Sequence, residues 1–355
     1  MPAAWTFAVA RADLAQTTIV EGPVPDLADG AALLRVDRVG MTANNVTYAV
    51  LGEAMRYWEF FPPSPRGLTV DLGLVPLWGF AEVAASTVPG VEAGQRVYGY
   101  LPPASHLMVR PVRVDDTGFR DGAPHRAELP SPYNAYRLTT GDAAYRADQE
   151  DLLILFRPLF FTSFMLADQF LDHDCYGAAQ LLLSSASSKT AYAAAFELRG
   201  RGPRVIGLTS PGNVAFTESL GCYDQVLPYD AITTLDPVPT AYLDLSGAPG
   251  TRAAVREHLG DRLVRDVAVG LTSQVPNAGA AGEVFFAPTQ MRKRTADWGR
   301  DGLDRRFSAA WHRFAEAVTA WVDVEPGHGP EGLCDAWLDV LAGRTAPRVG
   351  RVVQL

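Results

Sequence analysis

Short apolar runs alternate with helical segments through the middle of this chain, and this alternation is the feature that most limits its fold. The runs AQLLLSSAS and PRVIGLTS have the composition of buried strands, whereas KTAYAAAFELRG and NVAFTESLG have helical spacing. The alternation continues through QVLPYD, AYLDLSG, TRAAVREHLG and LVRDVAVGL. Strands that alternate with helices pair in parallel, with the helices on both faces, so residues 159–288 are predicted to form a Rossmann-like, doubly wound parallel sheet.

The sequence before residue 159 has a different character. Short apolar runs such as ALLRVDRVG and GQRVYGYL are broken by glycine and proline, which is typical of small twisted strands. Residues 111–146 show little periodicity and are expected to form a long surface excursion. A buried helix is expected after Pro158, an amphipathic helix over LDRRFSAAWHRFAEAVTAWV, and a final strand in GRVVQL. We therefore expect an α/β protein with a mainly-β domain (residues 1–158 and 289–355) and a Rossmann-like domain (159–288).

Length, charge and cysteine content narrow the class of protein. A chain of 355 residues is too long for one ordinary core. The net charge is -9, and the negative charges are spread along the sequence without a basic region, so the chain is expected to repel nucleic acid. The short basic cluster Met291-Arg292-Lys293-Arg294 is interpreted as a solvated loop. With no apolar run long enough for a membrane and no leader-like start, we expect a soluble, cytoplasmic protein. The 3 cysteines are far apart and are expected to be reduced.

The turn SSASSKT, between the first predicted strand and its helix, lies where a Rossmann domain binds the pyrophosphate of a dinucleotide. It lacks the usual glycines, so hydroxyl groups are expected to donate hydrogen bonds in their place, and a lysine supplies positive charge. The alternative is an N-capped helix with a solvated lysine. The candidates for phosphate contact are Ser185, Ser187, Ser188, Lys189 and Thr190.

Polar residues after the later strands extend this candidate site. An acidic residue after the second strand would bind the ribose of NAD, but Thr209, Ser210 and Asn213 stand there, so NADP is expected rather than NAD. A plain polar turn is the alternative. Glycines at the ends of the fourth and fifth strands permit close approach of a cofactor, or serve as ordinary turn residues. The remaining cofactor-binding candidates are Tyr229, Ser246, Gly247 and Gly270.

The segment LLLSSASSKTAYAAAFELRGRGPRVIGLTSPGNVAFTESLGCYDQVLPYD resembles the cofactor-binding half of quinone and enoyl reductases in the medium-chain dehydrogenase/reductase superfamily. LLRVDRVGMTANNVTY, GVEAGQRVYGYL and APRVGRVVQL follow the same family order, so the resemblance covers most of the chain. TANNVTYAVLGEAMRYWEFFP with the serine-rich turn is most similar to an uncharacterised bacterial family, a domain of unknown function within that superfamily. The resemblance implies a GroES-like catalytic domain around a Rossmann-like domain, and a homodimer.

The chain departs from the zinc-dependent members of this superfamily. It lacks their catalytic cysteine, their Gly-His-Glu motif and their four-cysteine structural loop. The one cluster of metal-ligand types is His173 with Asp172, Asp174 and Cys175, and a polar helix end is the commoner explanation for it. We therefore expect a zinc-independent protein with no metal site.

Hydride transfer without zinc needs a side chain that protonates the enolate or alkoxide formed. In the zinc-free enoyl reductases that the chain resembles, a tyrosine does this from a loop that corresponds here to TANNVTYAVLGEAMRYWEFFPP. Tyr57 and Tyr48 are nearly equal candidates, and Asn45, beside Asn44, is a candidate for orienting substrate or cofactor. The alternative is that these aromatics only pack a core. Thr162 stands where the family places a hydroxyl near the nicotinamide ribose, or else bonds its own helix.

The leading hypothesis is an NADPH-dependent reductase that delivers hydride to an activated C=C or C=O of a small apolar substrate, such as an enone, an enoyl thioester or a quinone. Two alternatives remain open, since a fold does not fix a reaction. One is an NADP-binding protein without redox turnover, and the other is a non-redox isomerase or lyase on the same fold.

Overall fold

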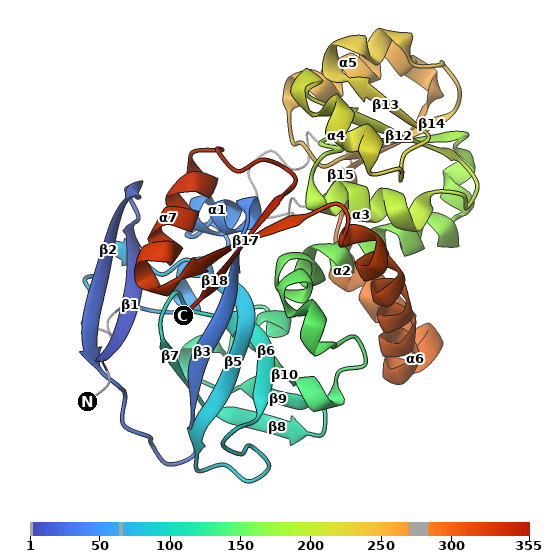
Figure 1. Cartoon of the computed structure of the whole chain (residues 1–355). Helices are drawn as coiled ribbons and strands as arrows, with labels where there is room; N and C mark the ends of the chain where they lie inside the picture. The colour runs from blue at the N-terminus through green and yellow to red at the C-terminus, as the bar shows by residue number, and fades with distance from the viewer. Residues whose placement is uncertain (1–2, 64–66, 270–282) are drawn as a thin grey trace. The chain divides into compact units, whose positions relative to one another are not determined.

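The structure is a computed structural model that describes residues 3–63, 67–269 and 283–355 and divides into two compact units (Figure 1). The first unit comprises Met1–Leu155 and Val322–Leu355, and the second comprises Phe156–Trp321. The second unit therefore extends beyond the boundary expected after residue 288. It does so because helix α6 (Ala287–Val318) packs Phe307, Trp311 and Phe314 against Phe160 of the second unit, with ring centroids 4.7–5.8 Å apart.

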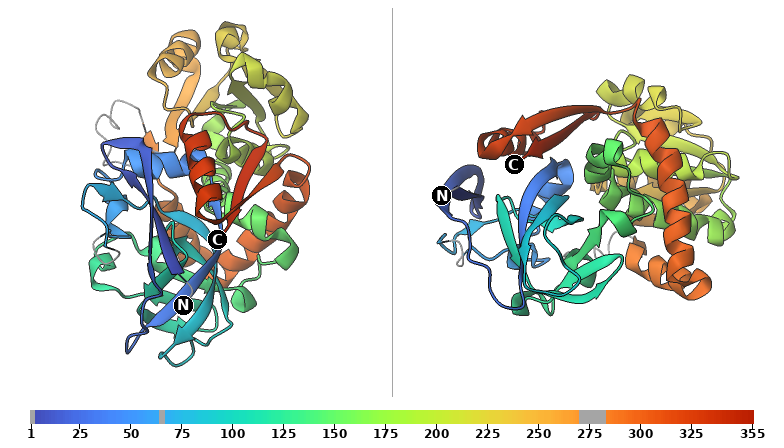
Figure 2. Two further views of the ribbon diagram at one scale, coloured as in Figure 1. Left: turned by 60° about the vertical axis from the view of Figure 1, so that its left-hand side comes forward. Right: turned by 60° about the horizontal axis from the view of Figure 1, so that its bottom comes forward.

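The first unit is mainly β. Its larger sheet has the order β17-β18-β3-β5-β6-β10-β9-β8, with β7 also paired to β3, and its smaller sheet has the order β2-β1-β4. Helix α7 (Gly329–Leu341) lies along β17 and β18, as Figure 2 shows. The strands are β1 (Ala3–Ala10), β2 (Asp13–Pro23), β3 (Ala32–Met41), β4 (Leu72–Gly73), β5 (Leu77–Ser86), β6 (Arg96–Leu101), β7 (His106–Val109), β8 (Pro111–Asp115), β9 (Gly118–Asp121), β10 (Ala135–Leu138), β17 (Asp323–His328) and β18 (Val349–Gln354).

Part of the segment expected to be a long surface excursion, residues 111–146, forms the strands β8, β9 and β10, and turns and short 3-10 helices make up the rest. Strands β8, β9 and β10 extend the larger sheet beyond β6 in antiparallel register, and they bury Phe119, Tyr136 and Leu138. The sequence did not indicate these three strands, because strands of four or five residues are too short to show a clear alternation.

The second unit contains a six-stranded parallel sheet with the order β13-β12-β11-β14-β15-β16. The sheet starts at its centre with β11, grows outward to β13, then returns to the other side of β11 with β14. This order is the doubly wound Rossmann arrangement, as predicted. The strands are β11 (Gln180–Leu183), β12 (Arg204–Thr209), β13 (Gln225–Pro228), β14 (Thr240–Asp244), β15 (Leu263–Val269) and β16 (Glu283–Phe285), and the helices between them are α3 (Lys189–Leu198), α4 (Val214–Ser219) and α5 (Pro249–Leu259).

Two helices begin earlier than the sequence indicates. Helix α2 (Glu150–Asp172) was expected to start after Pro158, but the proline lies inside it, at the loss of one backbone hydrogen bond. The basic cluster expected to be a loop belongs to α6, where Arg294 pairs with Asp168 at 2.6 Å and with Asp172 at 2.9 Å. None of the helices in the described ranges is both long enough and apolar enough to cross a membrane.

Candidate functional site

The order in which the chain adds strands to the Rossmann-like sheet reverses between the neighbouring strands β11 and β14. The chain leaves their carboxyl ends toward opposite sides of the sheet, which opens the crevice where doubly wound proteins bind ligands. Two segments follow these strand ends, the serine-rich turn of residues 184–188 after β11 and residues 245–248 after β14. The predicted cofactor-binding residues fall largely around these two segments.

The serine-rich turn is held by hydrogen bonds on both sides. Ser188 is the N-cap of α3, and its hydroxyl accepts a hydrogen bond from the Ala191 amide at 3.3 Å. Ser185 has φ +53°, an uncommon conformation for a residue with a side chain, and its amide donates to the hydroxyl of Tyr229 at 2.9 Å. The turn therefore has the capped start that the alternative interpretation expects, and it also brings Ser185 and Tyr229 together.

The turn also contacts the residues that follow β12. The hydroxyl of Thr209 donates to that of Ser187 at 3.2 Å, and the side-chain amide of Asn213 donates to the same oxygen at 3.3 Å. Thr209 is buried, whereas Ser210 is exposed. No acidic side chain follows β12 before α4 begins, so this end of the site presents hydroxyls and an amide rather than a negative charge.

Ala186 fixes the centre of the turn over β12. Its amide donates to the carbonyl of Leu208 and its carbonyl accepts from the hydroxyl of Tyr223, both at 2.9 Å. Gly207 lies directly beneath, and a Cβ on Gly207 would stand 2.8 Å from the Cβ of Ala186. The glycine is needed in the strand rather than in the turn, because the turn approaches the strand so closely.

We expect Gly207→Ala to lower the free energy of unfolding by about 1–3 kcal/mol, because the added methyl group overpacks the contact between turn and strand. Gly212→Ala is the matched control, since a Cβ there meets nothing within 4 Å, and it should change stability by less than about 0.5 kcal/mol. Urea unfolding of both variants measures the difference. Equal stability of the two variants would contradict this account of Gly207.

Lys189 places a cation at the first residue of α3. The side chain is half-buried, and its Nζ lies 5.9 Å from the centroid of the Phe156 ring. Burial disfavours the ammonium form and lowers the pKa of Lys189 to about 8. A positive charge also opposes the dipole at a helix N-terminus. A bound anion would relieve both penalties, so this position suits a phosphate.

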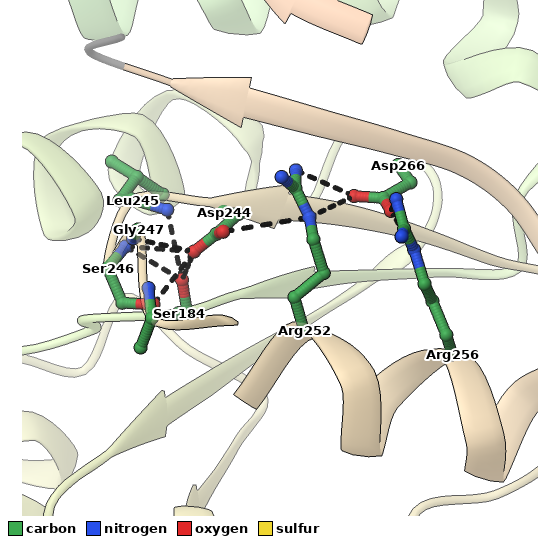
Figure 3. Close-up of polar contacts among 9 residues, drawn as sticks. Ser184, Asp244, Leu245, Ser246, Gly247, Arg252, Arg256 and Asp266 are labelled. Atoms are coloured by element: carbon green, nitrogen blue, oxygen red, sulfur yellow. Dashed lines mark hydrogen bonds and ion pairs between the residues drawn. The ribbon is translucent and has the colours of Figure 1, made fainter. Parts of the chain in front are cut away.

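A buried carboxylate, Asp244, organises the other segment (Figure 3). Its Oδ1 accepts hydrogen bonds from the Ser184 and Ser246 hydroxyls at 2.8 Å and from the Gly247 amide at 3.0 Å. The hydroxyl oxygen of Ser184 in turn accepts from the amides of Leu245 and Ser246 at 2.9 and 3.0 Å. Ser246 and Gly247, both predicted to bind cofactor, thus direct amides at Asp244.

The same carboxylate lies next to an ion-pair network that runs from the buried Arg252 to the exposed Arg256. The Nε of Arg252, on α5, lies 3.7 Å from Asp244 Oδ2, and Arg252 also pairs with Asp266 at 2.8 Å (Figure 3). Arg256 reaches the other oxygen of Asp266 at 2.5 Å. Burial raises the pKa of Asp244, but the bonds from Ser246, Ser184 and Gly247 and the charge of Arg252 outweigh it and hold that pKa below its ordinary value. This network was not predicted from the sequence.

In the first unit, the two candidate tyrosines belong to one aromatic cluster. The rings of Tyr48 and Tyr57 lie 4.7 Å apart, and their exposed fractions are 4% and 9%. The hydroxyl of Tyr48 accepts a hydrogen bond from Trp78 Nε1 at 3.1 Å. Tyr100 and Tyr133 complete the cluster, with their rings 4.7 Å apart. We call Tyr48, Tyr57, Tyr100 and Tyr133 the tyrosine cluster.

Burial changes the acidity of both candidates. It raises the pKa of Tyr48 far above its ordinary value, and the hydrogen bond from Trp78 reduces this effect only in part. Burial also raises the pKa of Tyr57. The cluster therefore keeps its hydroxyl groups protonated at neutral pH, as a proton donor requires.

Two other candidates are engaged by the protein's own backbone. Asn45 accepts a hydrogen bond from the Thr42 amide at 2.8 Å and donates one to the Pro76 carbonyl at 2.9 Å, which caps helix α1 (Ala43–Val50). Thr162 donates to the Pro158 carbonyl of its own helix at 3.2 Å. The structure thus gives both side chains a local structural task. Gly270 lies outside the described residues.

The structure also describes the residues near the predicted helix end. His173 Nδ1 lies 2.9 Å from the Gln169 carbonyl oxygen, and its ring stacks on Tyr176 with centroids 5.0 Å apart. Within residues 3–63, 67–269 and 283–355, no group of three or more His, Cys, Asp or Glu side chains is arranged to hold a metal ion.

Thr190, a candidate for phosphate contact, also joins two helices. Its backbone carbonyl accepts a hydrogen bond from the hydroxyl of Ser163 at 2.8 Å, which connects α3 to α2.

Solved structures with the same fold cover the whole chain. CurA from Vibrio vulnificus, solved in complex with NADPH, matches with a TM-score of 0.63 and 13% identity over 99% of this chain and 98% of its own. The Etr1p/NADP/crotonyl-CoA complex matches with a TM-score of 0.59, and the quinone oxidoreductase from Coxiella burnetii with 0.56, each at 13% identity over 100% of both chains. These likenesses confirm the predicted fold, with GroES-like and Rossmann-like parts.

Sequence comparison identifies the family. No curated protein matches this sequence significantly. The family model described as protein of unknown function (DUF2855) matches residues 39–346, in agreement with the resemblance seen in the sequence. This match spans most of the chain, and the chain therefore belongs to the DUF2855 family, with the fold of the quinone and enoyl reductases.

Proposed function

We propose that this protein is a zinc-free, NADPH-dependent reductase that acts on an activated C=C or C=O of a small apolar substrate, such as an enone, an enoyl thioester or a quinone. The observation that carries the proposal is the segment of residues 184–190, which follows β11 where the strand order of the sheet reverses. Lys189 stands at the start of α3, and no acidic residue lies between β12 and α4. Solved structures of the same fold contain NADPH or NADP, which supports this choice of cofactor.

The donor set of the site fits a phosphorylated dinucleotide. The side chains of Ser187, Ser188 and Lys189 would hold the pyrophosphate, as hydroxyl and ammonium donors at a helix N-terminus. Ser210 and Asn213 would hold the 2′-phosphate, where an acidic residue would repel it. When bound, the nicotinamide supplies hydride. This chain's own residues would orient it and, through Tyr57 or Tyr48, deliver the proton that completes reduction.

Cofactor titration and a substrate panel test the proposal. NADPH should bind more tightly than NADH by about tenfold or more, because the 2′-phosphate gains charge-assisted hydrogen bonds. Purified protein should oxidise NADPH with at least one enone, enoyl thioester or quinone. Failure to bind either cofactor would overturn the proposal. Binding without oxidation would favour a non-redox role, and product without net change in cofactor would identify isomerase or lyase chemistry.

Lys189→Met should weaken NADPH binding by about tenfold at pH 7, because a charged hydrogen bond to phosphate is lost. In the unmodified protein, the dissociation constant should rise as pH passes about 8, where Lys189 loses its proton. The sign follows from burial, which lowers this pKa and leaves the lysine positive only below it. Fluorescence titration between pH 7 and pH 9, roughly one unit either side of that pKa, would measure both effects.

Lys293→Met is the matched control, since Lys293 pairs with Asp172 and Asp297 at 2.9 Å on α6. It should leave both the affinity and its dependence on pH unchanged. A Lys189→Met protein that retains the affinity of the unmodified protein, or the same dependence on pH, would show that Lys189 does not contact phosphate.

A further inference from the structure

We propose that Ser184 and Asp244 are positioning residues for the cofactor, which join the serine-rich turn to residues 245–248 and fix both segments before a dinucleotide binds. We call this pair the Ser184–Asp244 link. The inference rests on the proposed function, in which NADPH binds beside these two segments. It gives the buried carboxylate a role in binding, although neither side chain of the link touches the cofactor.

Both side chains of the link are withdrawn from solvent. Ser184 is 0% exposed and Asp244 is 3% exposed, so a bound molecule has no access to either side chain. They contact each other instead, since the hydroxyl of Ser184 donates to Asp244 Oδ1 at 2.8 Å (Figure 3). Any effect of the link on binding must therefore pass through the backbone that it holds.

The hydroxyl of Ser184 joins the two segments through one atom. Ser184 is the first residue after β11 and begins the serine-rich turn, whereas Leu245 and Ser246 are the first residues after β14. The amides of Leu245 and Ser246 donate to the Ser184 hydroxyl oxygen at 2.9 and 3.0 Å. The start of one segment is thus bonded to the start of the other, at the strand pair where the strand order reverses.

Asp244 extends the link along the second segment. Besides Ser184, its Oδ1 accepts from the hydroxyl of Ser246 at 2.8 Å and from the amides of Ser246 and Gly247 at 3.0 Å. The hydroxyl oxygen of Ser246 in turn accepts from the amide of Ala248, the N-cap of α5, at 3.1 Å. The link therefore holds the chain from the end of β14 to the start of α5.

A fixed pair of segments favours binding because the ligand does not have to order them. A segment that is already held in its bound position adds no further loss of conformational entropy when the ligand arrives. The candidate phosphate donors Ser187, Ser188 and Lys189 follow Ser184 closely in the same turn. Their hydrogen bonds to phosphate depend on distance and angle, so a loosened turn should bind phosphate less well.

The test compares Ser184→Ala with Thr240→Ala, a control from the other end of the same two strands. The hydroxyl of Thr240 is also 0% exposed, and it accepts from Gln180 Nε2 at 2.9 Å, which joins β11 to β14 at their amino ends. It donates to the Val238 carbonyl at 2.7 Å. Each variant loses one buried, bonded hydroxyl, so both should lower the urea midpoint by similar amounts.

Only Ser184→Ala should weaken NADPH binding, by about five- to twentyfold, whereas Thr240→Ala should change the dissociation constant by less than about twofold. Asp244→Asn is a second variant of the link, because an uncharged amide oxygen holds the same donors less strongly. It should weaken binding in the same direction. Fluorescence titration at a temperature where all the variants are folded measures these constants.

Hydrogen exchange without cofactor tests the link itself. The amides of Leu245, Ser246 and Gly247 should exchange about tenfold faster in Ser184→Ala than in the unmodified protein, and Thr240→Ala should leave them unchanged. Unchanged exchange in Ser184→Ala would overturn the inference, whatever cofactor the protein binds.

The binding results separate this inference from the proposed function. Equal affinity of Ser184→Ala and the unmodified protein for NADPH would overturn the inference alone. Equal losses of affinity in Ser184→Ala and Thr240→Ala would also overturn it, because they would show a general effect of lowered stability. Failure of the unmodified protein to bind NADPH would overturn both proposals.

Discussion

Replacing Tyr57 with phenylalanine is expected to lower kcat for a reducible substrate by about 10²- to 10⁴-fold, the usual contribution of a positioned proton donor. The dissociation constant of NADPH should stay within about twofold, because the proposed role of Tyr57 is to donate a proton to the substrate and not to bind the cofactor. Tyr48→Phe should have a smaller effect, since Tyr48 is engaged by Trp78. Steady-state kinetics and cofactor titration of both variants measure these differences.

The double variant Tyr48→Phe/Tyr57→Phe tests whether Tyr48 can replace Tyr57 as the proton donor. If Tyr48 substitutes for Tyr57 in the single variant, the double variant should lose the residual turnover. Both variants keep the rings of the cluster, which pack 4.7 Å apart, so the fold should be preserved. An active protein in which neither variant nor their combination slows turnover would rule out a tyrosine donor in this cluster.

Asp244→Ala should produce the largest loss of stability, about 3–5 kcal/mol. The substitution removes the acceptor for Ser184, Ser246 and Gly247, and it takes one of two carboxylates away from Arg252, which is only 6% exposed. A buried charge that loses part of its compensation, together with buried donors left unsatisfied, is costly. Urea unfolding, with hydrogen exchange of the β11 and β14 amides, would locate the loss in the second unit.

Asp236→Ala is the matched control. Asp236 pairs with Arg204 at 3.2 Å, but their side chains are 67% and 50% exposed, and exposed pairs contribute at most about 1 kcal/mol.

The stability difference between unmodified protein and Asp244→Ala should persist at mildly acidic pH. Because the folded-state pKa of Asp244 is lowered, its contribution is present above the ordinary value of 3.8 and is lost only as pH falls through the lower folded value. Equal losses of stability in the Asp244→Ala and Asp236→Ala proteins would refute this account of Asp244.

The Rossmann-like sheet could be predicted because its strands and helices are short and contiguous. Most strands between Gln180 and Val269 are short, mainly apolar runs that alternate with helical segments, so the sequence pattern indicates a parallel sheet. The candidate turn was predictable for the same reason, since its place after the first strand is set by local order. Thr209, Ser187 and Asn213 meet because parallel strands end at the same edge.

The parts that could not be predicted depend on distant contacts. Asp244 and Ser184 lie 60 residues apart, and only the pairing of β11 with β14 brings them together. A charged residue closing an apolar strand, in AYLDLSG, was the available signal. Pro158 misled the start of α2, since proline favours a first helical turn but is tolerated within long helices.

The discontinuity of the first unit has a consequence for the order of folding during synthesis. Strand β18 (Val349–Gln354) pairs with β3 (Ala32–Met41), so the larger sheet cannot be completed until the last strand leaves the ribosome. The second unit, Phe156–Trp321, is contiguous and emerges before it. Because chains fold from the N-terminus as domains become available, we expect the nascent second unit to fold first, while the N-terminal strands wait for their missing neighbour.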